Sequence, residues 1–253
     1  MNLSAGTVVE FRRGCSWRDV RVILRGTGTV GQPVLIQSWG PGALPAPTFS
    51  ARKAGRFKDD AVISIEGSNI HVRDLAVRNS ASVGFGANGT RTVLHHVEGA
   101  GVVIGAWVRG RYAKVWNSYF HDLRMMPDTP GPNDDYGASG VVIEAHDVSV
   151  EGLTCRNCIG RSPDYDQWGG DGSFAEVWMK GDRLRLRYGY ADRTPRVLEA
   201  GGLGRQSARN MLVTNIYARS ISDAPFYFNP SGEYSGIATD GFLQRDNVIV
   251  RTN

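Results

Sequence analysis

The chain has 253 residues, of which 41% are hydrophobic, and this is enough apolar material for one large domain. No run of 18 or more apolar residues is present, so the sequence predicts no membrane-spanning helix. The net charge of +4 is spread along the chain and favours an anionic partner. No nucleic-acid-binding motif accompanies it, so we expect neither nucleic acid nor a membrane as a partner.

The N-terminal part predicts short strands separated by turns. Residues 7–11, 20–24 and 34–37 are rich in apolar side chains and have the length of short strands. The 32 glycines and 11 prolines suit the many turns that such strands need. We expect these segments to begin a stack of strands.

The middle of the chain repeats itself. Residues 65–79 match residues 143–157 almost position for position, and both indicate a strand, a tight turn and a second strand. Positions equivalent to Val72 recur along the chain at Leu94, Val115, Val150, Leu186, Val213 and Val250. The basic step is therefore 21 or 22 residues, and the longer steps carry insertions.

A unit of this length cannot bury its own apolar face, so its copies must stack on one another to make a core. A step of this size with three short strands predicts a right-handed, single-stranded parallel β-helix. We expect one all-β domain over residues 1–253. The chain ends inside the predicted strand 247–250, so we expect a capping segment to be missing there.

Insertions follow the last strand of a repeat in residues 122–137, 157–171 and 219–240. Loops that leave a solenoid at one corner project from one face, and such loops commonly form the walls of a binding groove. We therefore expect long loops on one face with a groove between them. The alternative is that these corners merely tolerate insertions.

Acidic residues near these insertions fall on equivalent positions of successive turns. At a step of 36 residues, Asp135 falls on Asp171, and Gly140 falls on Glu176. Since adjacent strands lie about 4.8 Å apart, stacked side chains would be close neighbours. The same step places Lys180 on another acidic residue, Glu144, so that the two could form an ion pair.

Glu199 falls beside Glu176 if the glycine-rich residues 201–204 form a bulge. Carboxylates this close repel each other and raise at least one pKa. Three arrangements relieve the repulsion, and the sequence leaves all three open. They are a bound Ca²⁺ with several carboxylate ligands, a carboxylic acid paired with a carboxylate for acid–base chemistry, and a structural network with neighbouring arginine and lysine.

Aromatic residues accompany the acidic ones. Tyr136, Tyr165, Trp168 and Trp178 lie in or beside the insertions, and exposed aromatic rings suit the C–H faces of sugars. The alternative is ordinary packing of the loops.

Cys155 and Cys158 form one C-x-x-C motif without a second pair or a nearby histidine, so they do not predict a zinc site. We interpret both as buried structural thiols.

Several of these segments resemble a known group of proteins. Residues 7–18 are similar to the opening strand of bacterial right-handed parallel β-helix proteins of the pectate-lyase-like superfamily. Residues 121–123, 134–137 and 165–176 also resemble that group, and the resemblance spans nearly the whole chain. It implies the β-helix fold and an activity on polysaccharides. This superfamily includes lyases, hydrolases, epimerases and binding proteins.

The order of Glu176 and Lys180 is similar to that in calcium-dependent lyases of the chondroitinase B and alginate lyase type. In those enzymes glutamates hold Ca²⁺ near the substrate carboxylate, and a lysine removes the proton. The chain departs from their pattern because the paired E-x-E is absent and Glu199 stands where those lyases have an arginine.

The first functional prediction is a polysaccharide lyase that cleaves a uronic-acid-containing chain by β-elimination. Its Ca²⁺ ligands would come from Asp135, Asp171, Glu176 and Glu199. The predicted catalytic residues are Lys180, Tyr136, Glu176 and Asp171, with Lys180 or Tyr136 as the base, and the predicted sugar-binding residues are Tyr165, Asp166, Trp168 and Trp178. We expect a secreted or periplasmic monomer whose partner is an acidic polysaccharide or oligosaccharide.

Two alternatives stay open. An inverting glycoside hydrolase would use two groove carboxyls about 6.5–9.5 Å apart, such as Asp135 or Asp171 with Glu199. A non-catalytic carbohydrate-binding β-helix would use the same face without turnover.

Overall fold

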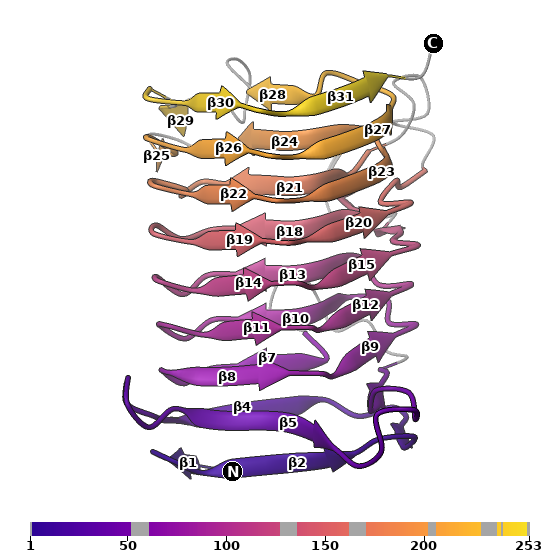
Figure 1. Ribbon diagram of the computed structural model, residues 1–253, viewed down its shortest axis with the longest axis vertical. Coiled ribbons are helices and arrows are strands. Elements are labelled where there is room, and N and C mark those ends of the chain that lie inside the picture. The colour runs from indigo at the N-terminus through magenta and orange to yellow at the C-terminus, as the bar shows by residue number, and fades with distance from the viewer. Residues whose placement is uncertain are drawn as a thin grey trace.

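The computed structural model describes residues 2–51, 61–126, 136–161, 171–201, 206–228, 237–238 and 240–251. Within these ranges, the strands form three parallel sheets of nine strands each, stacked as successive coils (Figure 1). Each coil contributes one strand to each sheet in a fixed order, so the chain is a parallel β-helix, as the sequence predicts. None of the described residues lies in a helix that is long and apolar enough to cross a membrane.

The three sheets are named here by the order in which the chain enters them. The first sheet contains β1 (Asn2–Ser4), β4 (Val22–Thr27), β7 (Ile63–Ile65), β10 (Val83–Ala87), β13 (Ile104–Val108), β18 (Ser139–Ile143), β21 (Ser173–Trp178), β24 (Arg196–Gly201) and β28 (Phe226–Phe228). The second sheet contains β2 (Val8–Arg12), β5 (Val34–Trp39), β8 (Ile70–Arg73), β11 (Val93–His95), β14 (Lys114–Trp116), β19 (Ser149–Glu151), β22 (Arg185–Arg187), β26 (Leu212–Thr214) and β30 (Leu243–Arg245). The third sheet contains β3 (Ser16–Trp17), β6 (Thr48–Phe49), β9 (Ala76–Arg78), β12 (Glu98–Ala100), β15 (Tyr119–His121), β20 (Thr154–Arg156), β23 (Tyr190–Thr194), β27 (Tyr217–Ile221) and β31 (Val248–Arg251). Two small sheets pair β16 (Met125–Met126) with β17 (Tyr136–Gly137), and β25 (Gln206–Ser207) with β29 (Ile237–Ala238).

Apolar side chains of equivalent positions stack inside the coils. In the second sheet, the predicted row is confirmed in register and fully buried at Val72, Leu94, Val115, Val150, Leu186 and Val213. The last predicted member of the row is wrong, because Val213 pairs with Gln244, whereas Val250 lies in β31 of the third sheet. An alignment guided by apolar character passes over the polar Gln244, and that is the source of the error.

The turn between the second and third sheets places one residue per coil in the left-handed conformation. Asp74, His96, Asn117, Tyr188 and Asn215 have φ angles of 56°, 52°, 45°, 56° and 57°. Asparagine and aspartate tolerate this conformation better than most residues, which accounts for three of the five. The repeated turn keeps the strands of successive coils in register.

The insertions lie at two corners of the coil instead of one. The segments between β15 and β18 and between β20 and β21 leave the corner from the third to the first sheet, as predicted. A further insertion at this corner, between β6 and β7, is not predicted from the sequence. The third predicted insertion is misplaced, because β28 follows β27 closely and the added residues lie between β28 and β30. They belong to the corner from the first to the second sheet, where β25 and β29 pair.

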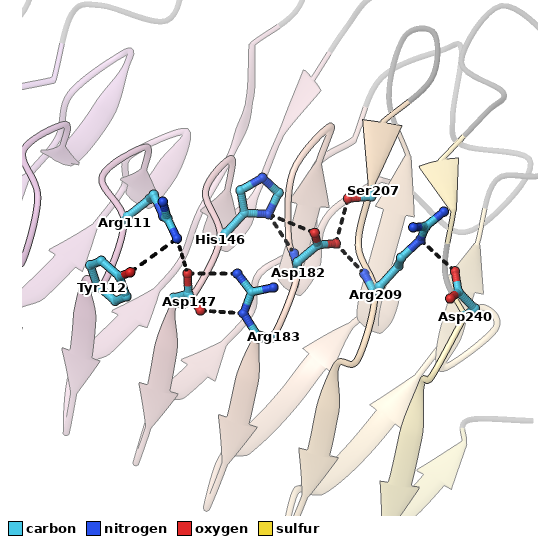
Figure 2. A network of polar contacts seen from close by, with 9 residues as sticks. All are labelled: Arg111, Tyr112, His146, Asp147, Asp182, Arg183, Ser207, Arg209 and Asp240. Carbon is cyan, nitrogen blue, oxygen red and sulfur yellow. Dashed lines mark hydrogen bonds and ion pairs between the residues drawn. The ribbon is translucent and has the colours of Figure 1, made fainter.

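That second corner carries a ladder of ion pairs across successive coils (Figure 2). Asp147 accepts from Arg111 Nη2 at 2.9 Å and from Arg183 Nη2 at 3.0 Å. Further along, the Arg209 backbone N–H donates to Asp182 Oδ1 at 2.8 Å. Hydrogen bonds from Arg183 and Arg111 lower the pKa of Asp147 despite the opposing effect of burial. The ladder therefore fastens coils whose inserted segments differ in length.

Candidate functional site

The candidate site lies on the outer face of the first sheet, at β21, β24 and β28. Glu176 of β21 pairs in register with Glu199 of β24, and Glu199 pairs with Tyr227 of β28. The two glutamates are therefore neighbours on adjacent strands, as the sequence predicts. In the same row, earlier coils carry Val142 and Trp107, so the polar end of the face adjoins an apolar end.

An arginine holds three carboxylates together. Arg196, the first residue of β24, contacts Asp171 Oδ1 at 3.0 Å and Glu199 Oε2 at 2.8 Å through the same nitrogen, Nη1. Its Nη2 contacts Asp223 Oδ2 at 2.8 Å, and its guanidinium lies over the ring of Tyr227, 5.1 Å from the centroid. The Arg196 side chain is only 10% exposed, so these contacts are largely shielded from water.

Glu176 has a different partner. The hydroxyl of Ser139 donates to Glu176 Oε2 at 3.0 Å, and Ser173 donates to the Ser139 oxygen at 3.3 Å. Asp171, Glu176, Glu199 and Asp223 with Arg196 are called the carboxyl cluster below. Four acids share one guanidinium, so the cluster cannot be electrically neutral with every carboxyl ionised.

The protonation of the carboxyl cluster follows from this imbalance. Burial and the charge of Asp171 raise the pKa of Glu176 to about 7. Burial, followed by the charges of Asp171 and Glu176, raises the pKa of Glu199 to about 8 although Arg196 opposes the shift. Burial also raises the pKa of Asp171. At neutral pH the cluster therefore retains at least one carboxyl proton.

The local fold holds Asp171 at the base of its loop. Gly160 and Asp171 form an antiparallel bridge with N–H···O distances of 2.7 and 3.0 Å, which closes the segment between them. Gly172 has a φ of +120°, and a Cβ there would lie 2.7 Å from the carbonyl oxygen of Cys158. Asp171 therefore follows a closed loop base and precedes a residue that must be glycine, so its backbone has little freedom.

The cysteines beside this loop base are buried, as predicted, but they are not free thiols. Cys155 and Cys158 form a disulfide. The C-x-x-C spacing alone did not reveal the pairing, because the same spacing occurs in free thiols and metal ligands.

The predicted 36-residue step holds in the second sheet but not in the first. There Val142 pairs with Glu176, so Gly140 does not fall on Glu176 and Glu144 does not fall on Lys180. Measured between register partners, the chain from β21 to β22 is two residues longer than the chain from β18 to β19. An alignment of the repeats on the second sheet therefore predicts register partners in the first sheet that are wrong by two residues.

The ion pair between Glu144 and Lys180 is accordingly replaced. Glu144 Oε2 contacts Arg109 Nε at 3.3 Å and accepts from Trp107 Nε1 at 3.2 Å. Lys180 is exposed in the turn after β21, where its backbone forms a bridge with Ser207.

Some of the predicted site residues lie together in the structure, and others lie outside the described residues. Asp171, Glu176 and Glu199 meet in the carboxyl cluster, and Trp178 lies on the same strand as Glu176, packed against the apolar end of the face. Outside the described residues lie Asp135, Tyr165, Asp166 and Trp168, together with the side chain of Tyr136, whose backbone pairs with Met126 in β17.

Four residues of the site are not among those predicted from the sequence: Arg196, Asp223, Ser139 and Tyr227. Arg196 directly precedes the apolar residues of β24, and a lone arginine at the start of a buried strand is the one signal that could have drawn attention to it.

The carboxyl cluster can be compared with the calcium site that the sequence predicts. Carboxylate oxygens are suitable Ca²⁺ ligands. In this arrangement, however, the guanidinium of Arg196 occupies the place between Asp171 and Glu199 where a cation would bind. Among the described residues, no group of three or more acidic, histidine or cysteine side chains is arranged to hold a metal ion. The described residues thus do not fit Ca²⁺ without displacement of Arg196, and the calcium site stays a prediction.

Comparison with known proteins finds a similar fold in solved structures of low sequence identity. No protein-family model and no curated protein matches the chain. The structure is similar to the GH136 lacto-N-biosidase from Eubacterium ramulus, with a TM-score of 0.50 and 14% identity over 100% of this chain and 51% of that one. It is also similar to the PL6 family alginate lyase AlyGC (TM-score 0.49, 13% identity, 92% and 39% covered) and to an alginate lyase from Paenibacillus sp. (0.48, 12%, 97% and 91%). The chain thus spans about half or less of the first two proteins, and the likeness at such identity concerns the fold.

Proposed function

We propose that this β-helix belongs to a polysaccharide-active enzyme that cleaves glycosidic bonds by acid–base chemistry at the carboxyl cluster. The observation that carries the proposal is the register pair of Glu176 and Glu199 on one outer face, with both pKa values raised toward neutrality. The sequence resemblance supplies the substrate class. A lacto-N-biosidase shares the fold, so the fold accommodates a carbohydrate substrate.

The two glutamates take different roles. Glu199, with the higher pKa, keeps its proton at neutral pH and donates it to the oxygen of the glycosidic bond as that bond breaks. Glu176 ionises first, so its carboxylate attacks the anomeric carbon and forms a glycosyl–enzyme ester. Glu199, now ionised, then removes a proton from water, and the resulting attack on the anomeric carbon releases the sugar and frees Glu176.

The spacing of the pair favours this retaining course. Register partners on adjacent strands lie about 4.8 Å apart. Retaining glycosidases separate their carboxyls by about 5–5.5 Å, whereas inverting enzymes need about 6.5–9.5 Å to admit water. The strand spacing of Glu176 and Glu199 is therefore closer to the retaining separation than to the inverting one.

The Arg196 guanidinium keeps the neighbouring carboxylates in place. It contacts Glu199 and Asp171 through one nitrogen and Asp223 through another, so it restricts the rotamers of all three. Such a clamp holds Glu199 oriented between the two proton transfers.

β-Elimination of a uronate chain is the second candidate. The sequence resemblance and the exposed Lys180, which follows the strand that carries Glu176, favour it. Lys180 or Tyr136 would then serve as the base.

The test is a turnover assay on a panel of polysaccharides, including alginate, polygalacturonate and neutral glycans. The expected result is new reducing ends without the ultraviolet absorbance of unsaturated uronate, and activity that a chelator does not remove. Glu176→Gln and Glu199→Gln should each lower kcat by about 10²–10⁴. The control Glu66→Gln, at an exposed glutamate on β-helix coils far from the site, should leave kcat unchanged.

Three results would contradict the proposal. Absorbance at the unsaturated-uronate band that disappears with chelator would establish the elimination route. Inversion of the anomeric configuration, followed by NMR, would exclude the roles given to Glu176 and Glu199. Full activity in both glutamine variants would place the chemistry elsewhere.

A further inference from the structure

The outer face of the second sheet carries a cationic strip on β8, β14 and β22. Figure 1 shows these strands on the near side of the molecule, with the first sheet behind them. Two outward rows run along the coils. One row stacks Lys114, Ser149 and Arg185, and the other stacks His95, Trp116, Glu151 and Arg187.

Two buried N–H donors in this strip have no acceptor. Trp116 Nε1 and Arg187 Nε are both shielded from solvent without a hydrogen-bond partner. They lie in the same row, one on each side of Glu151. Neighbouring side chains cover both atoms, so the exposed groups of the strip must make the first contacts with any ligand.

The acidic residue between these donors does not serve them. Glu151 Oε1 already accepts from Arg187 Nη2 at 2.6 Å and from the Ser149 hydroxyl at 2.7 Å. These hydrogen bonds lower the pKa of Glu151 against the opposing effect of burial, so its charge is matched within the strip.

The exposed charges beside the donors are positive. Arg73, Lys114 and Arg185 are exposed on the same face, and the Lys114 ammonium lies 4.7 Å from the centre of the Trp116 ring. The strip thus presents cations and an aromatic ring, and this combination complements a polymer with negative charges and sugar rings.

We propose that this strip binds an acidic polysaccharide lying along the stacking direction of the coils. Carboxylates of the polymer contact Lys114 and Arg185, while a sugar ring packs beside Trp116. The surface is separate from the carboxyl cluster, which lies on the first sheet. The inference shares the carbohydrate substrate class with the proposed function but none of its catalytic roles.

The experiment is calorimetric titration of the chain with oligogalacturonate, repeated in a Glu199→Gln background so that cleavage does not consume the ligand. The double variant Lys114→Ala/Arg185→Ala should weaken binding at least tenfold. Trp116→Ala removes the ring against which the sugar packs, and it should weaken binding about fivefold. The control Arg18→Ala/Arg193→Ala removes equal charge from exposed positions outside the second sheet and should leave affinity unchanged.

Circular dichroism and thermal unfolding of each variant separate loss of binding from loss of fold. Equal affinities of the wild type and Lys114→Ala/Arg185→Ala would overturn the proposal. So would tighter binding of single-stranded DNA than of oligogalacturonate with the same dependence on Lys114 and Arg185, because the strip would then serve nucleic acid. Binding without any cleavage would refute the proposed function and leave this inference intact. Cleavage by the wild type, together with unaltered binding by Lys114→Ala/Arg185→Ala, would refute this inference and leave the proposed function intact.

Discussion

Replacement of Glu176 by glutamine should stabilise the protein at alkaline pH. The glutamine oxygen can still accept the hydrogen bond that Ser139 donates at 3.0 Å, and no guanidinium loses a partner, because Arg196 contacts the other carboxylates of the cluster. The substitution therefore removes the charge of Glu176 while preserving its shape. Any change in stability reports the free energy of ionising this side chain in the folded state.

The sign and size follow from the pKa of Glu176, which folding raises from 4.5 to about 7. Between these two values the folded state binds a proton that the unfolded state releases, so stability falls as pH rises from 4.5 toward 7. Above pH 7 the deficit is complete and constant. At about 1.4 kcal/mol per pKa unit, it amounts to about 3 kcal/mol.

The assay is urea unfolding of the wild type and Glu176→Gln at pH 5, 7 and 9. The free energies of unfolding should differ little at pH 5 and should favour the variant by about 3 kcal/mol at pH 9. Glu66→Gln serves as the control, because Glu66 pairs with Arg25 on an exposed surface and should show no such rise. A variant that is less stable than the wild type at pH 9 would refute the reasoning, since Glu176 would then be stabilised as a carboxylate.

Three further predictions concern the site, a corner and the core. Ser139→Ala removes the hydroxyl that stabilises the ionised form of Glu176, the proposed nucleophile, so the acidic limb of the kcat/KM profile should move up by about one pH unit; an unmoved limb would contradict this. Asp147→Asn should lower the free energy of unfolding by about 1 kcal/mol at pH 7, with a smaller effect in 1 M salt and as the pH falls below 3.8, where the unfolded chain takes up a proton that the folded carboxylate, with its lowered pKa, does not. Gly105→Ala should destabilise by about 1–3 kcal/mol, because its Cβ would lie 2.3 Å from the ring of Phe120, whereas Gly31→Ala, in open space, should be neutral in the same unfolding assay.

The fold could be predicted from the sequence because every coil buries its apolar side chains through the same alternation of apolar and polar residues. Val72 and Leu94 reveal their equivalence through apolar character at a constant step, and the register confirms it. The prediction is wrong at the last coil, where Gln244 is the register partner of Val213. A polar side chain there gives no apolar signal, so periodicity alone selects the wrong neighbour.

The site was predictable only in part, for a geometric reason. The nearness of Glu176 and Glu199 depends on one strand pair, and that pair follows from the stacking of coils. The position of Asp223 depends on the path of the short segment between β27 and β28, and the role of Arg196 depends on which carboxylates its long side chain reaches. Neither follows from an alignment of repeats, because both lie where the repeats differ in length.

The stacking that makes a β-helix stable also explains why its outer face can hold reactive carboxyls. Equivalent positions of successive coils lie at strand spacing, so two acids in one row are held together by backbone hydrogen bonds along the whole sheet and cannot move apart. Burial is the first cause of the raised pKa values of Glu176 and Glu199, and neighbouring carboxylates add to it, with Arg196 offsetting only part of the shift. If the row were merely structural, a neutral pair would serve better and glutamine would be the expected residue. The presence of two acids beside a single guanidinium is therefore consistent with the proposed role, in which one carboxyl gains or loses a proton during turnover.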